Sequence, residues 1–128
     1  MCLSCDVTAG YDPNFSNVFE KRNSSIVSCG ACMNKFTGSR GKSGSSDASA
    51  ETVGKVRKIF GDNNIVWQTA ELGKVDIGGG GTVAKFISQL NIDTVDLGVP
   101  VISMHSPYEL ISKADLYSLY RASLAFLK

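Results

Sequence analysis

The chain has 128 residues, of which 43% are hydrophobic and 20% are charged, and its formal net charge at pH 7 is +1. This length suits one domain with a modest core, and the near-neutral charge argues against nucleic-acid binding, which requires a basic excess on one face. No apolar run approaches 18 residues, so we expect no membrane span. The first six residues lack the basic start and apolar stretch of a signal peptide, so we expect a cytoplasmic protein.

The first part of the chain predicts two extended segments separated by turns. Residues 3–7 read as a short strand that ends near Asp6, followed by a loop rich in turn residues. Residues 26–36 read as a second extended segment. Residues 37–46 are rich in Gly and Ser and predict a loop, whose glycine spacing does not match a Walker phosphate-binding motif.

Helices and strands alternate through the rest of the chain. Residues 47–60 predict a helix with Ser46 or Asp47 as its N-cap, and residues 64–69 predict a strand. Residues 82–90 predict a second helix, and a third begins at Ser112, where Asp115 completes a capping box. The expected inner faces of these two helices are formed by Val83, Phe86, Ile87 and Leu90, and by Leu116, Leu119, Tyr120 and Leu127. The alternation predicts a layered α/β sandwich.

The most apolar segment is residues 95–106, VDLGVPVISMHS, which contains the only histidine. It predicts a buried strand that contains residues 99–103, with Gly98 and Pro100 at one side and Ser106-Pro107 at the other. His105 falls where this strand ends, and ligands gather at the carboxyl ends of strands in open α/β sheets. A lone histidine fits a purely structural role equally well.

Four consecutive glycines, residues 78–81, directly precede the second predicted helix. They are either a flexible loop or a segment that brings backbone N–H groups close to a ligand, and the position before a helix favours the second interpretation.

The four cysteines form two pairs, Cys2-x-x-Cys5 and Cys29-x-x-Cys32, a spacing that formally matches a zinc ribbon. On a strand, however, residues i and i+3 face opposite sides. We therefore favour free, semi-buried thiols over a structural zinc site.

Four segments, read in order, resemble the C-terminal part of the aspartyl aminopeptidase/aminopeptidase I family (metallopeptidase family 18), which are binuclear zinc exopeptidases. They are DVTAGYDPN at residues 6–14, GSRGKSGSSDA at 38–48, WQTAELGKVDIGGGGTVAKF at 67–86 and VDLGVPVISMHSPYEL at 95–110. The resemblance covers nearly the whole chain and implies the three-layer α/β sandwich of zinc exopeptidases.

The resemblance also implies roles for single residues. Asp6 and His105 match zinc ligands, Lys35 matches a lysine that holds acidic substrate side chains, and the substrate pocket is lined by residues matching Gly80, Gly81 and Thr82. Aspartyl-specific members carry histidines where this chain has Ala9 and Asp12, which puts the preference for acidic residues in doubt.

Family members are several times longer, and their remaining metal ligands, their general-base glutamate and a dimerisation domain lie upstream of the matching segment. With one histidine, this chain cannot assemble a two-zinc centre by itself. The resemblance thus implies a peptide-cleaving enzyme, with two zinc or other divalent ions per intact site, that needs its N-terminal part and is oligomeric when intact. The alternatives are a non-catalytic assembly fragment and a small Cys-type zinc-binding module.

Overall fold

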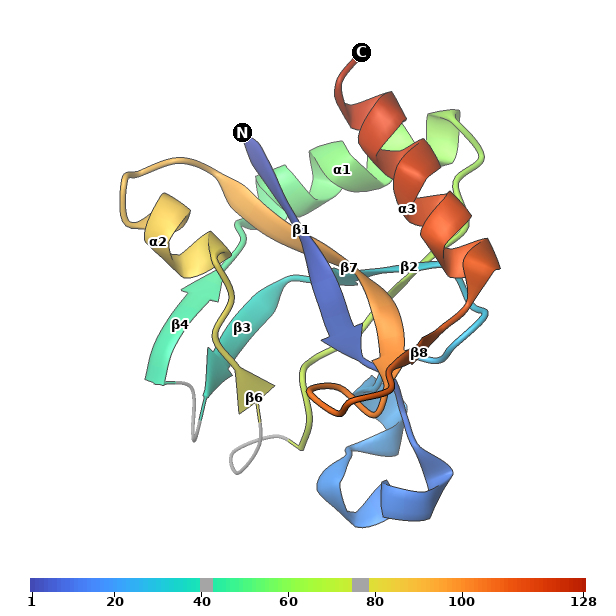
Figure 1. Cartoon of the computed structure of the whole chain (residues 1–128). Coiled ribbons are helices and arrows are strands. Elements are labelled where there is room, and N and C mark those ends of the chain that lie inside the picture. Colours follow the sequence, from blue (N-terminus) through green and yellow to red (C-terminus); the bar gives the residue numbers. More distant parts are fainter. Residues whose placement is uncertain (40–42, 75–78) are drawn as a thin grey trace.

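The computed structural model describes residues 1–39, 43–74 and 79–128. Within them, a five-stranded mixed sheet has the order β1-β7-β2-β5, with β8 paired to β7. Its strands are β1 (Cys2–Ala9), β2 (Ala31–Asn34), β5 (Trp67–Thr69), β7 (Thr94–Ile102) and β8 (Leu110–Ile111). β1 is parallel to β7, and both strands run away from the end of the molecule that carries the two chain termini (Figure 1).

A second sheet has the order β4-β3-β6 and consists of β3 (Phe36–Ser39), β4 (Ser43–Asp47) and β6 (Gly79–Gly80). The prediction of a plain loop over residues 37–46 was therefore wrong, except for residues 40–42, which lie outside the described part. The hydroxyls of Thr37 and Ser46, cross-strand partners in this sheet, lie 2.8 Å apart. Two short polar side chains thus bond across the strands that carry them.

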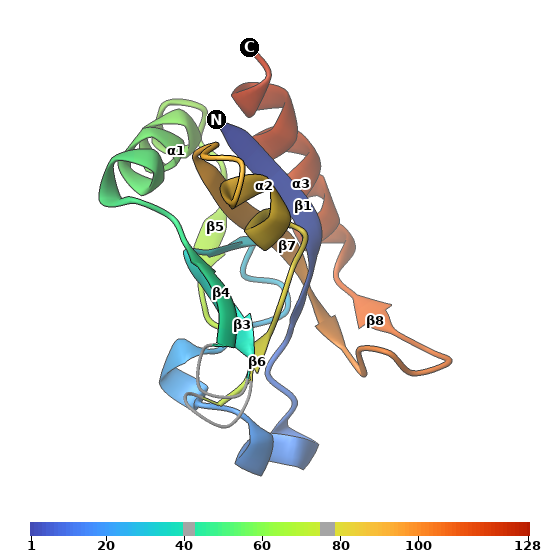
Figure 2. The same ribbon diagram turned by 90° about the vertical axis from the view of Figure 1, so that its left-hand side faces the viewer.

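Three α-helices accompany these sheets: α1 (Ala50–Asp62), α2 (Ala84–Ser88) and α3 (Lys113–Phe126). Two 3-10 turns, η1 (Pro13–Val18) and η2 (Lys21–Asn23), follow β1. Both views place α2 above the three-stranded sheet (Figures 1 and 2). The predicted α/β class is confirmed, and no helix in the described residues is long and apolar enough to cross a membrane.

The apolar core lies between the larger sheet and helices α1 and α3. Its buried members are Ala31, Met33, Ala48, Val56, Phe60, Ile65, Val95, Leu97 and Ala122. The first of these helices begins later than predicted, because Asp47 belongs to β4. Its N-cap is Ser49, whose hydroxyl accepts a hydrogen bond from the Thr52 N–H at 3.2 Å.

β7 is longer than predicted and includes Gly98 and Pro100, which we expected to bound it. A Cβ at position 98 would lie 3.0 Å from the carbonyl oxygen of Asp6, so glycine at this position allows β1 to approach closely without a shift of its backbone. The Val101 carbonyl accepts a hydrogen bond from the Gly10 N–H, so the backbone groups of Val101 face β1. Those of the preceding residue, Pro100, face the opposite side of β7, because successive residues of a strand alternate. Neither β2 nor β8 pairs with Pro100, and its missing N–H breaks no ladder bond.

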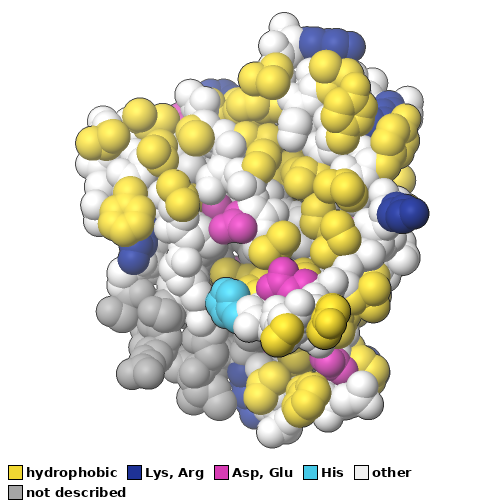
Figure 3. Space-filling view, viewed as in Figure 1, with side chains coloured by type: hydrophobic (Ala, Val, Ile, Leu, Met, Phe, Trp, Pro, Cys, Tyr) yellow, Lys and Arg dark blue, Asp and Glu magenta, His cyan; other side chains and the backbone are white. Residues whose placement is uncertain are grey.

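The predicted inner faces of α2 and α3 were largely wrong. Val83, Phe86 and Leu90 are exposed, and Ala84 is the buried residue of α2. On α3, Leu119 packs against the core, but Leu116, Tyr120 and Leu127 are exposed. Hydrophobic side chains accordingly gather over both helices in the space-filling view (Figure 3). The periodicity identified apolar stripes, but not whether another element covers them.

The predicted capping box at the start of α3 is also absent. Ser112 is the N-cap residue but makes no side-chain capping bond. Asp115 is instead fully buried, and its two carboxylate oxygens accept hydrogen bonds from the backbone N–H groups of Ser28 and Gly30, each at 2.7 Å. A residue expected to stabilise its own helix thus fixes the turn before β2.

Candidate active site

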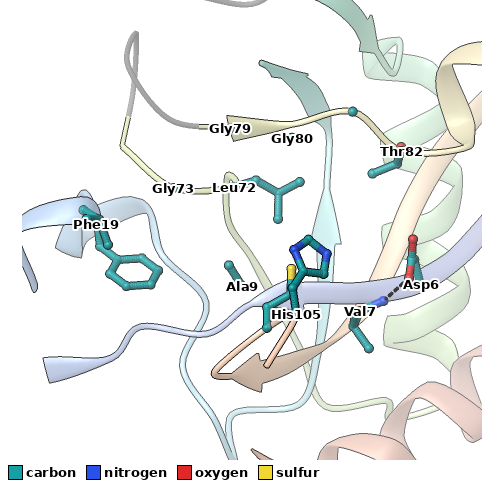
Figure 4. Close-up of a pocket in the computed structure, with 13 residues that line it drawn as sticks. Asp6, Val7, Ala9, Phe19, Leu72, Gly73, Gly79, Gly80, Thr82 and His105 are labelled. Atoms are coloured by element: carbon teal, nitrogen blue, oxygen red, sulfur yellow. Dashed lines mark hydrogen bonds between the residues drawn. The ribbon is translucent and has the colours of Figure 1, made fainter. Parts of the chain in front are cut away.

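One pocket, of about 350 Å³, lies where β1 and β7 end. It is lined by Asp6, Val7, Ala9, Val18, Phe19, Leu72, Gly73, Gly79, Gly80, Gly81, Thr82, Met104 and His105. The side chains of Asp6 and His105 point to the side on which residues 79–82 lie (Figure 4). The structure therefore brings together five of the six site residues indicated by the sequence, from three distant parts of the chain.

His105 lies in a tight turn directly after β7. Ser103 and His105 both have left-handed backbone conformations, with φ of 61° and 66°, and the Ser106 N–H donates to the Ser103 carbonyl at 3.0 Å. The backbone N–H of His105 donates to Glu109 Oε1 at 2.6 Å. Such conformations cost free energy in residues other than glycine and cluster at functional sites. This turn holds the imidazole at the mouth of the pocket.

Asp6 lies on β1, which forms one edge of the larger sheet among the described residues. Its side chain is exposed, and Oδ1 accepts a hydrogen bond from the Val7 N–H at 2.7 Å. This bond fixes the carboxylate close to its own backbone. The second oxygen, Oδ2, is available to a ligand at the pocket.

The glycine segment forms the opposite wall of the pocket. Gly79 has φ of 103°, and a Cβ there would lie 2.1 Å from the Gly38 carbonyl oxygen, so glycine is required for β6 to pair with β3. Gly80 and Gly81 line the pocket. The predicted start of the run, Gly78, lies outside the described residues. The ligand-facing role of this segment stays a prediction.

Thr82 completes this wall and is hydrogen-bonded to Asp96 of β7. The Thr82 hydroxyl donates to Asp96 Oδ2 at 2.7 Å. Asp96 is only 5% exposed, and burial raises the pKa of its carboxyl, an effect that the Thr82 hydrogen bond and the neighbouring Ser4 hydroxyl oppose and the nearby Asp6 reinforces. Asp96 was not among the site residues that the sequence indicated. The available signal was a carboxylate inside an otherwise apolar strand.

Lys35 does not join the other five residues. It lines a separate pocket with Arg57, Trp67 and Glu71, and its ammonium forms an ion pair with Asp47 of β4. The side chain is half exposed. Its predicted contact with substrate is not tested by this arrangement and stays a prediction.

The two CxxC pairs do not converge on one point. Cys5 pairs with Leu97 and lies 3.8 Å from the Ser123 hydroxyl of α3, whereas Cys32 pairs with Gly98 on the other face of the sheet. The Cys32 thiol donates to Asn34 Oδ1 at 3.1 Å, and burial raises its pKa to about 12. A zinc ligand must be a thiolate, so this thiol is poorly suited to the zinc-ribbon alternative.

The donor set of the pocket fits part of a zinc site. Zinc in proteins is bound by imidazole nitrogen and carboxylate oxygen, among other ligands, and catalytic sites use three protein ligands with an open position. Asp6 and His105 are one side chain of each kind at this pocket. The described residues contain no group of three or more His, Cys, Asp or Glu side chains placed to hold a metal. Any complete site at this pocket therefore needs ligands from elsewhere.

Comparison with known proteins identifies relatives of this chain in sequence and in structure. A relative from Clostridium acetobutylicum, named as a probable M18 family aminopeptidase 1, is 50% identical over 125 residues, which make up 98% of this chain and 27% of the relative. The crystal structure of aminopeptidase I from the same organism superimposes with a TM-score of 0.93 at 49% identity, and that of an M18 aminopeptidase from Thermotoga maritima with 0.94 at 42%. Each match covers 98% of this chain and 28% of the solved chain.

The chain thus spans little more than a quarter of the length of the relatives it matches. The sequence model of the aminopeptidase I zinc metalloproteases (M18) matches residues 1–127, which is almost every residue. The chain belongs to this family of zinc metalloproteases.

Proposed function

We propose that this chain supplies one part of the active site of a zinc aminopeptidase. In this proposal Asp6 and His105 are metal ligands, and residues 80–82 line the substrate pocket. The observation that carries it is the meeting of Asp6 and His105, 99 positions apart in the sequence, at one pocket closed by the glycine segment. Zinc chemistry is the one use of this pair that the family membership also supports.

The residues of this chain have defined tasks in such a site. When bound, zinc ions lower the pKa of a coordinated water and polarise the carbonyl of the peptide bond to be cleaved. Asp6 offers Oδ2 as a ligand, since Oδ1 is already held by the Val7 N–H. His105 offers its imidazole from a turn fixed by the Glu109 bond. The segment 80–82 limits the space in which the N-terminal residue of a peptide lies.

The other ligands come, in this proposal, from the remaining part of the enzyme. Two features of the described residues support this. β1 pairs only with β7, so its outer edge offers unpaired backbone groups to a further strand. The apolar side chains of α2 and α3 flank this edge on the same face of the molecule (Figure 3). We expect this chain to be inactive alone.

The finer expectations belong to the same proposal. The intact site holds two zinc or other divalent ions, its substrates are peptides, and the intact protein is a cytoplasmic homo-oligomer. The second candidate function is a non-catalytic assembly fragment, which the exposed apolar stripes of α2 and α3 favour. Such a fragment would use those stripes and have no need of Asp6 or His105.

The test is a full-length chimera in which this chain replaces the matching segment of the Clostridium acetobutylicum relative. We expect the chimera to contain zinc and to hydrolyse amino-acid anilides, and the chain alone to do neither. His105→Ala and Asp6→Asn should each lower kcat/KM by about 1,000-fold, with loss of zinc, because each removes a ligand.

Asp93→Asn is the matched control, because Asp93 is an exposed aspartate at the opposite end of β7. It should leave zinc content and activity unchanged. An active chimera that tolerates both His105→Ala and Asp6→Asn would refute the ligand assignment, and an inactive, zinc-free chimera of normal stability would favour the assembly fragment.

A further inference from the structure

One face of the larger sheet carries a row of polar side chains beneath the pocket. The cross-strand pairs Ser4–Asp96 and Asn34–Asp96 place these three residues side by side on β1, β7 and β2. Asp96 and Asn34 are 5% and 4% exposed. A carboxyl group at the centre of such a row is unexpected, because burial of a charge is unfavourable unless the charge is well paired.

The polar neighbours of Asp96 largely bond among themselves. The Asn34 amide donates to the Thr8 hydroxyl at 2.9 Å and accepts from the Cys32 thiol at 3.1 Å. These bonds stay within the sheet and tie β1 to β2. They account for Asn34 as a structural residue without reference to any ligand.

Asp96 differs from Asn34 because its Oδ2 accepts a hydrogen bond from a residue outside the larger sheet. That oxygen accepts from the hydroxyl of Thr82, which lies in the segment between β6 and α2. Its other oxygen, Oδ1, is buried and has no hydrogen-bond partner among the described residues. An unsatisfied buried oxygen destabilises the fold. The carboxyl is therefore not explained by stability, and its one outward bond leads to the wall of the pocket.

The geometry separates the two partners of this bond. Thr82 lines the pocket with Gly80 and Gly81, whereas Asp96 does not line it. Asp96 thus reaches a ligand in the pocket by hydrogen bonding through Thr82 and not by direct contact. The segment has few other anchors among the described residues: β6 is two residues long, and Val83 caps α2 without a side-chain bond.

We propose that Asp96 is a positioning residue: it holds Thr82, and with it residues 79–81, in the pocket wall, and so sets how tightly the pocket binds the N-terminal residue of a peptide. The effect on binding rests on the proposed function, whereas the anchoring of the segment does not. The role requires a hydrogen-bond acceptor at position 96 and a hydroxyl at position 82. It does not require a negative charge.

The anchoring is tested by amide hydrogen exchange on the 128-residue chain. Asp96→Ala and Thr82→Val should each speed exchange of the amides of residues 79–84 by about 10-fold, while β1 and β7 keep their protection. Thr94→Val is the control, because Thr94 is a buried threonine of the same strand whose hydroxyl bonds to the nearby Ile92 carbonyl. It should leave residues 79–84 unchanged. Unchanged exchange in both Asp96→Ala and Thr82→Val would overturn the anchoring.

The effect on binding is tested by kinetics of the full-length chimera. Asp96→Ala and Thr82→Val should each raise KM by about 10-fold with kcat and zinc content unchanged, since they remove binding shared by ground and transition states. The KM of the double variant should lie within about twofold of that of either single variant, because both substitutions break the same hydrogen bond. Asp96→Asn and Thr82→Ser, which keep the acceptor and the hydroxyl, should retain the original KM within about twofold.

These outcomes separate the two proposals. Additive effects in the double variant, or a fall in kcat with KM unchanged, would overturn the positioning role. A chimera that is inactive without any substitution would refute the proposed function and the effect on peptide binding with it. The exchange experiment would still decide whether Asp96 anchors Thr82.

Discussion

The two faces of the larger sheet differ in their side chains and in what they contact. One face packs against α1 and α3 and is formed by aliphatic side chains, among them Leu3, Val95, Leu97 and Met33. The other carries small or polar side chains from the same strands: Ser4, Asp6 and Thr8 of β1, Asp96, Gly98 and Pro100 of β7, and Cys32 and Asn34 of β2. The first face stabilises the fold, and the second supports the pocket.

β7 shows the division within a single strand. Its aliphatic residues Val95, Leu97, Val99 and Val101 alternate with Thr94, Asp96, Gly98 and Pro100. Successive side chains of a strand point to opposite faces. One strand can therefore build the core with every second residue and hold a pocket wall with the others, so substitutions on the two faces should have separable effects.

The largest effect on stability is expected on the helix-packed face. Phe60 of α1 is fully buried against Trp67, with ring centroids 5.9 Å apart, so Phe60→Ala should lower the free energy of unfolding by about 3–5 kcal/mol. Phe86→Ala is the matched control, because Phe86 of α2 is 58% exposed, and it should change stability by less than about 0.5 kcal/mol. Urea unfolding measures both. Equal losses in the two variants would contradict the assignment of the core to this face.

A smaller, pH-dependent effect is expected at Asp96, on the polar face. Burial raises its folded-state pKa above the ordinary value of 3.8, so the folded protein holds this proton more tightly than the unfolded chain does. The contribution to stability is fully present below the ordinary value and is lost as pH rises through the raised folded-state pKa. Asp96→Asn removes this loss and should make the chain more stable than the original at neutral pH.

Urea unfolding over a pH series measures this difference between the two proteins. The difference in the free energy of unfolding between Asp96→Asn and the original chain should grow as pH rises from the ordinary aspartate range and then level off. Asp93→Asn is the control, since Asp93 is exposed and should show no such gap. A gap that is constant across the series would show that the carboxyl has the same pKa in the folded and unfolded chain.

The smallest effect on stability is expected at the proposed ligands themselves. Asp6 and His105 are exposed, and Asp6→Asn keeps an oxygen able to accept from the Val7 N–H. Both Asp6→Asn and His105→Ala should change the free energy of unfolding of the chain by less than about 0.5 kcal/mol. A loss several times larger, seen in the same urea experiments, would mean that these residues serve the fold, and the contrast between the faces would fail at its most important point.

The sequence by itself determined the alternation of strands and helices, and it placed His105 just after a strand, whereas Asp6, expected at the end of a strand, lies within β1, which runs on to Ala9. These features depend on local patterns: β-branched runs, helical periodicity and turn residues decide secondary structure over a few residues. Gly80 and Gly81 were indicated by their place in a glycine run before a helix, and the family resemblance indicated them together with Thr82. Family membership follows from the whole-chain match.

Only the tertiary structure decided which side each residue faces and what it meets there. Lys35 lies in another pocket because β2 turns into β3 at that point, and Asp115 bonds to the turn at residues 28–30 instead of capping its helix. The Thr82–Asp96 bond joins residues on different elements, and no local pattern encodes it. Periodicity specifies that a face is apolar, but the packing of distant segments specifies what covers it, and that is why the stripes of α2 were misassigned.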